Sequence, residues 1–181
     1  MTFKEFFHKI NIFGRMNEAY RQARNFDVED DNEYFAAVSD LLEEEGIRRL
    51  DCFIQHSDIT TLKHVICVSY ITYRACRHFG LDWRAGARAG ILHDYVTYDW
   101  HEPGDGSHRL HGFRHPRFAL ENSRKITELS PLEENCIKRH MWPLTPVPPR
   151  YREAFVLTFV DKFCATKETF RKYRRGTEEK R

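Results

Sequence analysis

Ala89-Gly-Ile-Leu-His-Asp-Tyr95 places a histidine and an aspartate side by side at the centre of an apolar segment with helical character. Neither His93 nor Asp94 is a favourable core residue, because a carboxylate removed from water is strongly destabilised unless it is paired or bound to a metal ion. The doublet therefore predicts a polar site inside the protein. We take it as the point around which the rest of the chain is organised.

Helices are predicted on both sides of the doublet. His56-Ser-Asp-Ile-Thr-Thr61 offers N-cap side chains before an apolar run from Leu62 to Phe79, and Gly80 is typical of a helix C-terminus. Asp82 caps a second helix, expected from Trp83 to about Tyr98. Its segment Ala85-Gly-Ala-Arg-Ala-Gly90 has side chains small enough for another helix to approach closely.

Three more helices are predicted towards the C-terminus. Pro116 suits the first position of a helix that runs to about Leu129. Ser130-Pro-Leu-Glu133 forms a capping box for the next helix, to about His140. The four prolines between 142 and 149 interrupt helical structure before a last helix from about Arg150 to Tyr173. No strand pair is predicted, so the expected fold is all-α, a helical bundle.

Residues 1–50 are expected to form an N-terminal helical extension. Its first 30 residues are aromatic-rich and fit either a helix laid on the core or a partner-binding flap, and residues 32–46 have the period of an amphipathic helix. Residues 51–175 would form the main domain and 176–181 a charged tail. The basic segment Arg171-Lys-Tyr-Arg-Arg175 is better explained as a solvated helix end than as an RNA site.

The composition narrows the class of protein. The chain has 181 residues, 41% of them hydrophobic, which suits one domain with a substantial core. Its net charge of +2 gives no overall field that would attract nucleic acid or an anionic membrane. Five cysteines without a CxxC pair predict reduced thiols, and no apolar run reaches the roughly 18 residues of a membrane span. We therefore expect a soluble, cytoplasmic protein.

Histidines and aspartates recur at intervals of 21 to 29 residues around the doublet. This spacing places about one of them on each predicted helix, so that an antiparallel bundle would direct them into one interior cavity. Four imidazoles and two carboxylates suit two first-row metal ions, with one carboxylate as a bridge. The predicted ligands are His64, His93, Asp94, His115, His140 and Asp161.

The order His…His-Asp…His…His…Asp resembles the HD-domain superfamily of metal-dependent phosphohydrolases in its two-metal form. The resemblance extends from about Thr61 to about Thr166. The segments that resemble a compact bacterial branch of this family are Ala87-Arg-Ala-Gly-Ile-Leu-His-Asp94, Leu110-His-Gly-Phe-Arg-His-Pro116, Ala119-Leu-Glu-Asn122, Lys138-Arg-His-Met-Trp-Pro-Leu144 and Val160-Asp-Lys162. Tyr95-Val-Thr-Tyr98 replaces the Gly-Tyr-Pro signature of the cyclic-di-GMP branch, which argues against that substrate.

The resemblance implies an HD-type helical bundle that hydrolyses a phosphoester with one or two Mn, Fe, Co, Ni or Mg ions. By position, His64, His93, Asp94 and Asp161 correspond to the first metal site, and His115 and His140 complete a second site with Asp94 as the bridge. Asp94 would also orient the attacking hydroxide. The implied partner is a small phosphorylated substrate such as a nucleotide.

Four residues are candidates for contacting the substrate. Arg114, Arg150 and Lys162 supply the positive charge that phosphoryl transfer requires beyond the metal ions. His111 belongs to the segment that resembles the bacterial branch. The segment from Trp100 to Phe113 and the four-proline segment are expected to form the mouth of the cavity.

Two other functions stay open at this stage. A branch of the same superfamily holds a mixed-valent di-iron centre with four histidines and two aspartates and activates oxygen, so the ligands alone do not separate hydrolase from oxygenase. A non-catalytic module that senses a nucleotide is the second alternative. A complete ligand set argues against this module, since a site without catalysis needs no six ligands.

Overall fold

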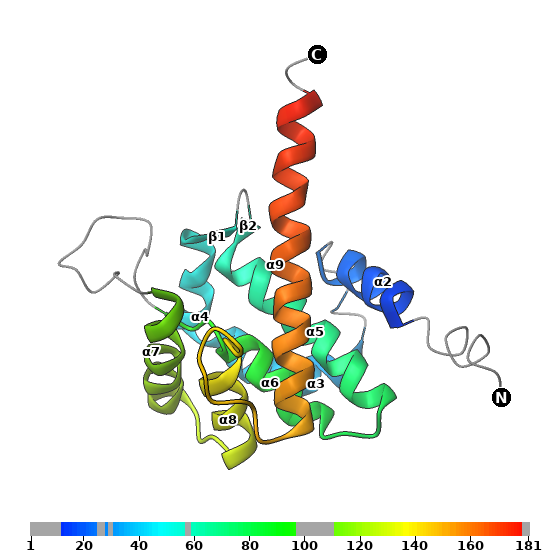
Figure 1. Cartoon of the computed structure of the whole chain (residues 1–181). Coiled ribbons are helices and arrows are strands. Elements are labelled where there is room, and N and C mark those ends of the chain that lie inside the picture. Colours follow the sequence, from blue (N-terminus) through cyan, green and yellow to red (C-terminus); the bar gives the residue numbers. More distant parts are fainter. Residues whose placement is uncertain (1–11, 25–27, 29–30, 57–58, 97–110, 179–181) are drawn as a thin grey trace.

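The computed structural model describes residues 12–24, 28, 31–56, 59–96 and 111–178. Helices dominate this part of the chain, as predicted, and α9 lies lengthwise across the bundle in Figure 1. The elements are α2 (Ile12–Arg24), α3 (Asn32–Glu43), α4 (Glu45–Arg48), the 3-10 helix η1 (Arg49–Cys52), β1 (Ile54–His56), β2 (Ile59–Thr60), α5 (Thr61–His78), α6 (Trp83–Leu92), α7 (His111–Ile126), α8 (Pro131–Arg139) and α9 (Arg152–Glu178).

Helix α5 is the centre of the fold. It packs against α2, α6 and α9, and most extensively against α6. The close approach to α6 depends on Gly90, where a Cβ would overlap the backbone of Ser69. Ser69 also donates its hydroxyl to the carbonyl of Ala87 at 2.6 Å and accepts from Tyr34 at 2.9 Å. The prediction that the small residues of α6 admit a neighbouring helix is confirmed.

Several helix ends follow the predicted caps. Thr60 accepts a hydrogen bond from the Lys63 amide at the start of α5, and Gly80 follows that helix with φ +63°. Ser130 and Glu133 form the predicted capping box of α8. Residues 142–149 form turns between α8 and α9. These ends are well predicted because capping depends on local sequence.

Two predicted boundaries are wrong. Helix α6 ends at Leu92 and not near Tyr98, because the chain tightens there and Tyr95 donates its amide to the carbonyl of Leu92. Helix α7 begins at His111, so Pro116 lies inside it and not at its first position. A proline this near the N-terminus removes only one backbone hydrogen bond.

A short antiparallel pair, β1 and β2, joins η1 to α5 and was not predicted. Its strands have three and two residues, too short for an alternating pattern to be visible in the sequence. The N-terminal helix α2 packs on α5, which fits the interpretation of a helix laid on the core. Residues 1–11 lie outside the described part of the chain, as do 97–110, which hold most of the first of the two segments predicted to form the cavity mouth.

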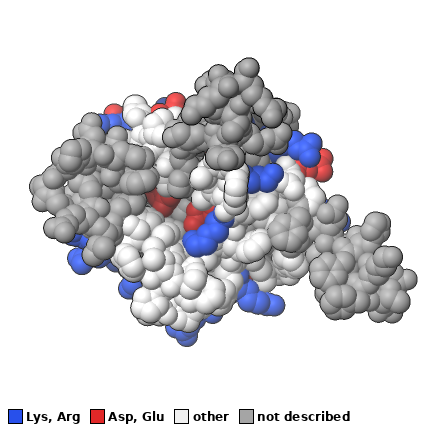
Figure 2. Space-filling view, turned by 45° about the horizontal axis from the view of Figure 1, so that its top comes forward, with Lys and Arg blue, Asp and Glu red and all other residues white. Residues whose placement is uncertain are grey.

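The described cysteines are free thiols, and four of the five are buried. Burial raises the pKa of the Cys76 thiol to about 12, so this group stays protonated and packs as a small apolar side chain. On the face shown in Figure 2, Lys and Arg side chains stand apart from one another, and acidic groups lie beside a basic one near the centre. No described helix is both long and apolar enough to span a bilayer.

Candidate metal centre

The structure brings the six predicted ligands together in the interior, and none is more than 7% exposed. Five of the six residues lie within a helix or at its C-cap, and Asp94 directly follows the C-cap of α6, so the centre draws on α5, α6, α7, α8 and α9. The ligand atoms form two groups of three, which we call the first half (His64, His93 and Asp161) and the second half (Asp94, His115 and His140).

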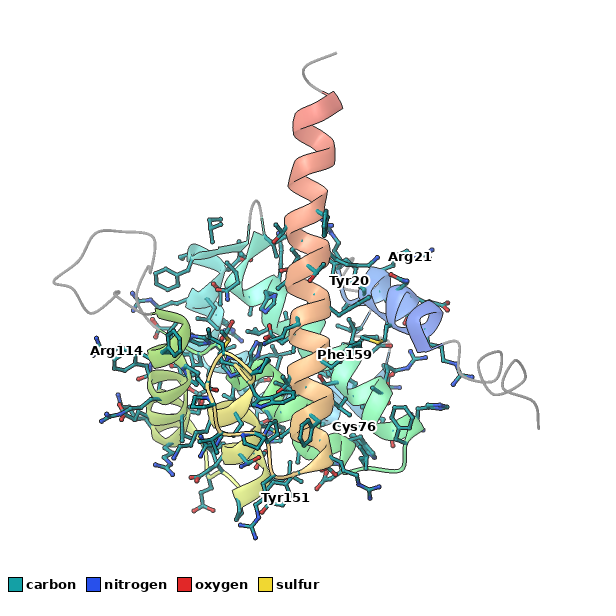
Figure 3. The ribbon with its side chains drawn as sticks, viewed as in Figure 1. Tyr20, Arg21, Cys76, Arg114, Tyr151 and Phe159 are labelled. Atoms are coloured by element: carbon teal, nitrogen blue, oxygen red, sulfur yellow. The ribbon has the colours of Figure 1, made fainter. Side chains whose placement is uncertain are left out.

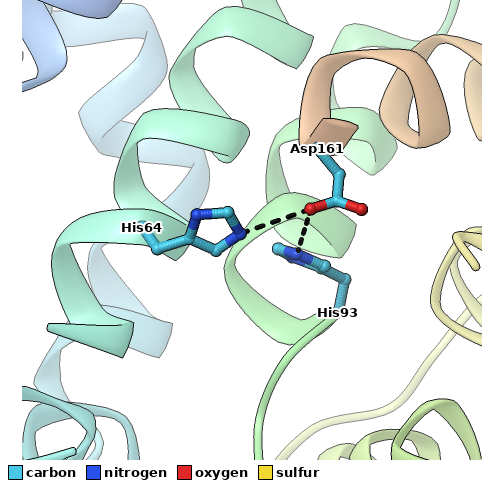
Figure 4. Close-up of side chains that lie close together, drawn as sticks. All are labelled: His64, His93 and Asp161. Atoms are coloured by element: carbon cyan, nitrogen blue, oxygen red, sulfur yellow. Dashed lines mark ion pairs between the residues drawn. The ribbon is translucent and has the colours of Figure 1, made fainter. Parts of the chain in front are cut away.

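The first half joins three helices that pack closely. His64 lies in the first turn of α5, His93 caps the C-terminus of α6, and Asp161 lies in the middle of α9. Both imidazoles direct Nε2 at the same oxygen, Asp161 Oδ1, at 3.4 Å from His64 and 3.8 Å from His93. Figure 4 shows this convergence. His93 is held by a 2.8 Å bond between its Nδ1 and the carbonyl of Gly90.

The second half lies at helix ends. His140 caps the C-terminus of α8, and its Nδ1 lies 2.8 Å from the carbonyl of Ile137, which requires the proton on Nδ1. Nε2 of His140 is therefore an acceptor, and it lies 2.7 Å from Nε2 of His115. Both nitrogens also approach Asp94 Oδ1, at 3.1 Å from His115 and 3.5 Å from His140. Three potential ligand atoms thus face one point.

Asp94 connects the two halves through its two oxygens. Oδ1 faces His115 and His140, whereas Oδ2 lies 3.5 Å from Nε2 of His93 and 3.9 Å from Nε2 of His64. A carboxylate between two histidine pairs has the arrangement of a bridging ligand. This position depends on the early end of α6, which turns Asp94 away from the helix axis.

The donor set fits transition-metal ions. Ligand atoms bound at about 2.1 Å to one ion lie roughly 3.0–3.4 Å from each other. The separations are 3.4 and 3.8 Å in the first half and 2.7, 3.1 and 3.5 Å in the second half, so they lie on both sides of this range. Two buried atoms, Nε2 of His93 and Oδ1 of Asp94, have no hydrogen-bond partner among the described residues. Such atoms are costly in a protein interior unless they bind an ion.

The electrostatics of the metal-free centre suit ligands in their binding form. Burial alone would raise the pKa of Asp94, but His93 and His115 outweigh it and hold that pKa well below the ordinary value. For Asp161, the nearby imidazoles of His64 and His93 overcome the same effect of burial and hold the pKa well below the ordinary value. Burial and the neighbouring His115 lower the pKa of His140 to about 3. The carboxylates are therefore ionised and His140 is neutral, as metal coordination requires.

His64 behaves differently from His140. Burial alone would lower the pKa of its imidazole, but Glu168 and Asp161 raise that pKa well above the usual value. In the metal-free centre His64 therefore holds a proton on each ring nitrogen. An ion that binds at Nε2 would displace one of them, so we expect metal binding at this half to release a proton.

Two residues that support the ligands were not predicted. Gln55, on β1, donates its amide to Asp94 Oδ2 at 2.6 Å and accepts from the Thr61 hydroxyl at 3.2 Å. Glu168, on α9, lies 2.9 Å from Nδ1 of His64 and is 1% exposed. Gln55 lies on a strand that was not predicted, and no pattern in the sequence marks it. Glu168 follows Asp161 by seven residues, two helical turns on the same face, and this spacing was the available signal.

The four candidate substrate residues lie in different places. Nζ of Lys162 donates to the carbonyl of His140 at 2.9 Å and to Asp161 Oδ2 at 3.0 Å, which places it at the edge of the centre. Arg114 is exposed on the outer side of α7, with its guanidinium 5.5 Å from the ring centre of Phe118 (Figure 3). Arg150 is exposed beside Tyr151, before α9 begins. His111 opens α7, but its side chain lies outside the described residues.

A separate pocket of about 650 Å³ lies between α2 and α5 and contains none of the six ligands. Its basic side chains already have partners within the protein. Arg77 pairs with Glu33, Arg74 donates to Tyr70 and Gln22, and Arg15 lies 3.1 Å from Nδ1 of His78. The described residues that could hold a metal ion therefore lie in the interior centre and not in this pocket.

Comparison of the chain with protein-family models, with curated proteins and with solved structures finds no significant match. The statements about function below therefore rest on the residues of the centre and on the resemblance in motif order.

Proposed function

We propose that this protein is a metal-dependent phosphohydrolase of the HD-domain type, acting on a nucleotide or another small phosphoester. The observation that carries the proposal is the position of Asp94, whose two oxygens face two different pairs of histidines. Such a bridge is typical of two-metal hydrolytic sites, and the motif order resembles that family. When bound, two divalent ions lower the pKa of a shared water and stabilise charge on phosphoryl oxygens.

The chain's own residues would perform the remaining tasks. Asp94 is ionised and buried. It can therefore fix the position of the two metal sites relative to each other and accept a hydrogen bond from the attacking water. Gln55 fixes the rotamer of this carboxylate through the 2.6 Å bond to Oδ2. Burial of the centre excludes bulk water, which strengthens electrostatic interactions with a substrate.

Lys162 is the best-placed cation for the substrate. An ammonium group has three N–H donors, and the bonds to His140 and Asp161 use two of them. Its side chain is 41% exposed, so the third donor can reach a phosphoryl oxygen that enters from solvent. In this proposal Arg114 has no assigned role, because it is exposed on the outer side of α7 (Figure 3). Arg150, which is exposed beside Tyr151, has none either.

The test is metal analysis followed by a hydrolysis screen. Protein purified without added metal, and then loaded with Mn²⁺ or Co²⁺, should bind about two equivalents and release phosphate from nucleotides or a chromogenic ester. The control is Asp40→Ala, which removes an exposed carboxylate on α3. Metal binding without any hydrolysis across the screen would contradict a phosphohydrolase and favour a sensing module.

The second candidate is a di-iron oxygenase, because the same four imidazoles and two carboxylates are also compatible with two iron ions. Imidazole and carboxylate together suit iron as well as manganese. Predominant iron in the purified protein, near-ultraviolet absorption of an oxo-bridge and consumption of oxygen would support it. Phosphoester hydrolysis with redox-inert Mg²⁺ would contradict it.

A further inference from the structure

Glu168 is a buried carboxylate whose position the hydrolytic proposal does not explain. It is 1% exposed, and its Oε2 lies 2.9 Å from Nδ1 of His64. Its other oxygen, Oε1, has no hydrogen-bond partner among the described residues. A buried carboxylate with a single partner costs the fold stability. Its place directly behind His64 suggests a function that outweighs this cost.

Helix α9 places one carboxylate on each side of the His64 ring. Asp161 faces Nε2 at 3.4 Å, and Glu168, two turns further along the helix, faces Nδ1. The contact between Nδ1 and Glu168 makes Nε2 the ring nitrogen that faces the first half of the centre, so Nε2 is the atom that would bind an ion there. A carboxylate behind a ligating histidine fixes its tautomer and ring orientation and makes it a stronger donor.

The other two rings whose Nδ1 bonds are resolved have neutral partners. His93 uses the carbonyl of Gly90, and His140 uses the carbonyl of Ile137, both at 2.8 Å. A backbone carbonyl orients the ring in the same way but adds no negative charge. Among these three described rings, the one with a negative charge behind it is His64, in the first half.

We propose that Glu168 is a positioning residue that makes the first half the tighter of two metal sites, so that a divalent first-row ion fills the first half before the second. This inference rests on the proposed binding of metal by the six-residue centre, but it does not depend on which reaction the centre catalyses.

The decisive measurement compares metal affinity in a single-site background. His115→Ala removes one ligand of the second half and leaves the first half intact. In this background, Co²⁺ titrations followed by visible absorption would compare the parent with Glu168→Gln, which keeps the shape and the acceptor oxygen but loses the charge. We expect Glu168→Gln to weaken Co²⁺ binding by about 10- to 100-fold. An unchanged dissociation constant would overturn the inference.

The matched control is Glu153→Gln, which removes a carboxylate from the same helix. Glu153 precedes Glu168 by 15 residues, which is roughly 22 Å along the helix. Its carboxylate accepts a hydrogen bond from the Asp82 amide. In the His115→Ala background, the Glu153→Gln variant should bind Co²⁺ as tightly as the His115→Ala parent does. An equal loss in both variants would mean that helix charge in general, and not Glu168, sets the affinity, and would also overturn the inference.

The order of filling has a spectroscopic readout that a merely structural carboxylate would not affect. With one equivalent of Zn²⁺ added to the wild-type protein, nitrogen chemical shifts of His64 and His93 should change before those of His115 and His140. Glu168→Gln should reduce this preference. Simultaneous change of all four rings in the wild type would contradict a tighter first half.

The outcomes separate this inference from the proposed function. If the wild-type protein binds no metal, both fail. If it binds metal and Glu168→Gln binds equally well, the inference alone fails. If Glu168→Gln weakens binding and no phosphoester is hydrolysed, the inference is supported and the phosphohydrolase fails.

Discussion

The two halves of the metal centre are positioned by different kinds of structure. The first half joins α5, α6 and α9, which pack against one another over buried surfaces. In the second half, Asp94 lies just beyond the end of α6, His140 caps α8, and His115 lies in the second turn of α7. The first half, in which only His93 lies at a helix C-terminus, depends mostly on how closely the helices approach. In the second half, the positions of Asp94 and His140 depend on where α6 and α8 stop.

Asp94 is the residue that the two halves share. We therefore expect Asp94→Ala to cause the largest loss of bound metal. Because Asp94 faces histidines of both halves, its loss should remove nearly all metal from both sites, and hydrolysis with it. Metal analysis after gel filtration, with Asp40→Ala in parallel, measures this. One equivalent of metal retained by Asp94→Ala would show that Asp94 serves a single site.

Removing one histidine from each half separates the two sites. His93→Ala should abolish the ion of the first half, and His115→Ala that of the second, so each variant is expected to retain about one of two equivalents. Each substitution removes an imidazole that reaches one Asp oxygen of its own half. If either variant binds no metal at all, the halves form one indivisible site.

Substitutions at two glycines test how closely the helices around each half are packed. A Cβ at Gly90 would overlap the Ser69 backbone between α5 and α6, whereas at Gly112, on α7, it would meet the end of the Leu144 side chain at 3.0 Å. Backbone cannot move aside as a side-chain methyl can. We expect Gly90→Ala to lower the free energy of unfolding by about 1–3 kcal/mol or more.

Gly112→Ala should be neutral or slightly stabilising, because alanine favours a helix by about 1 kcal/mol over glycine. Urea unfolding of the metal-free variants measures both changes. Equal losses of stability in the two variants would mean that the first half is no more tightly packed than the second.

The sequence predicts the six ligands better than the residues that support them. The His93-Asp94 doublet and the regular spacing of the other ligands can be recognised in the sequence, because histidine and aspartate are unusual in apolar helices. Glu168 precedes a strongly basic segment and looks like a solvated side chain, and only the packing of α9 on α5 shows that it is buried. Gln55 depends on a strand pair of three and two residues, which no periodic pattern reveals.

Helix boundaries are likewise predicted well where they depend on local sequence, and poorly where they depend on tertiary contacts. The capping box of α8 is encoded by Ser130 and Glu133 and was predicted correctly. The end of α6 at Leu92 is not marked by a glycine or proline. At this point His93 bonds to the carbonyl of Gly90, and Asp94 faces the histidines of the second half. The helix end therefore depends on contacts that the sequence does not reveal.

A further expected effect concerns pH and distinguishes His140 from His64. The pKa of His140 falls from about 6.5 when unfolded to about 3 when folded, so the unfolded chain binds more protons between these values. Its contribution to stability is complete above pH 6.5 and declines as the pH falls towards 3. His64 has the opposite sign, because its raised pKa stabilises the fold below pH 6.5 and loses this effect only as the pH rises through the folded value.

His140 should therefore add a slope of up to about 1.4 kcal/mol per pH unit to the unfolding free energy of the metal-free protein between pH 6 and 4. His140→Gln should remove this part of the slope, whatever its effect on stability at neutral pH. Urea unfolding at several pH values in the presence of chelator measures it for both proteins. Parallel curves would show that His140 is protonated in the folded state, in which case Nε2 of His140 would donate to Asp94 or His115 and would not be ready to bind a metal ion.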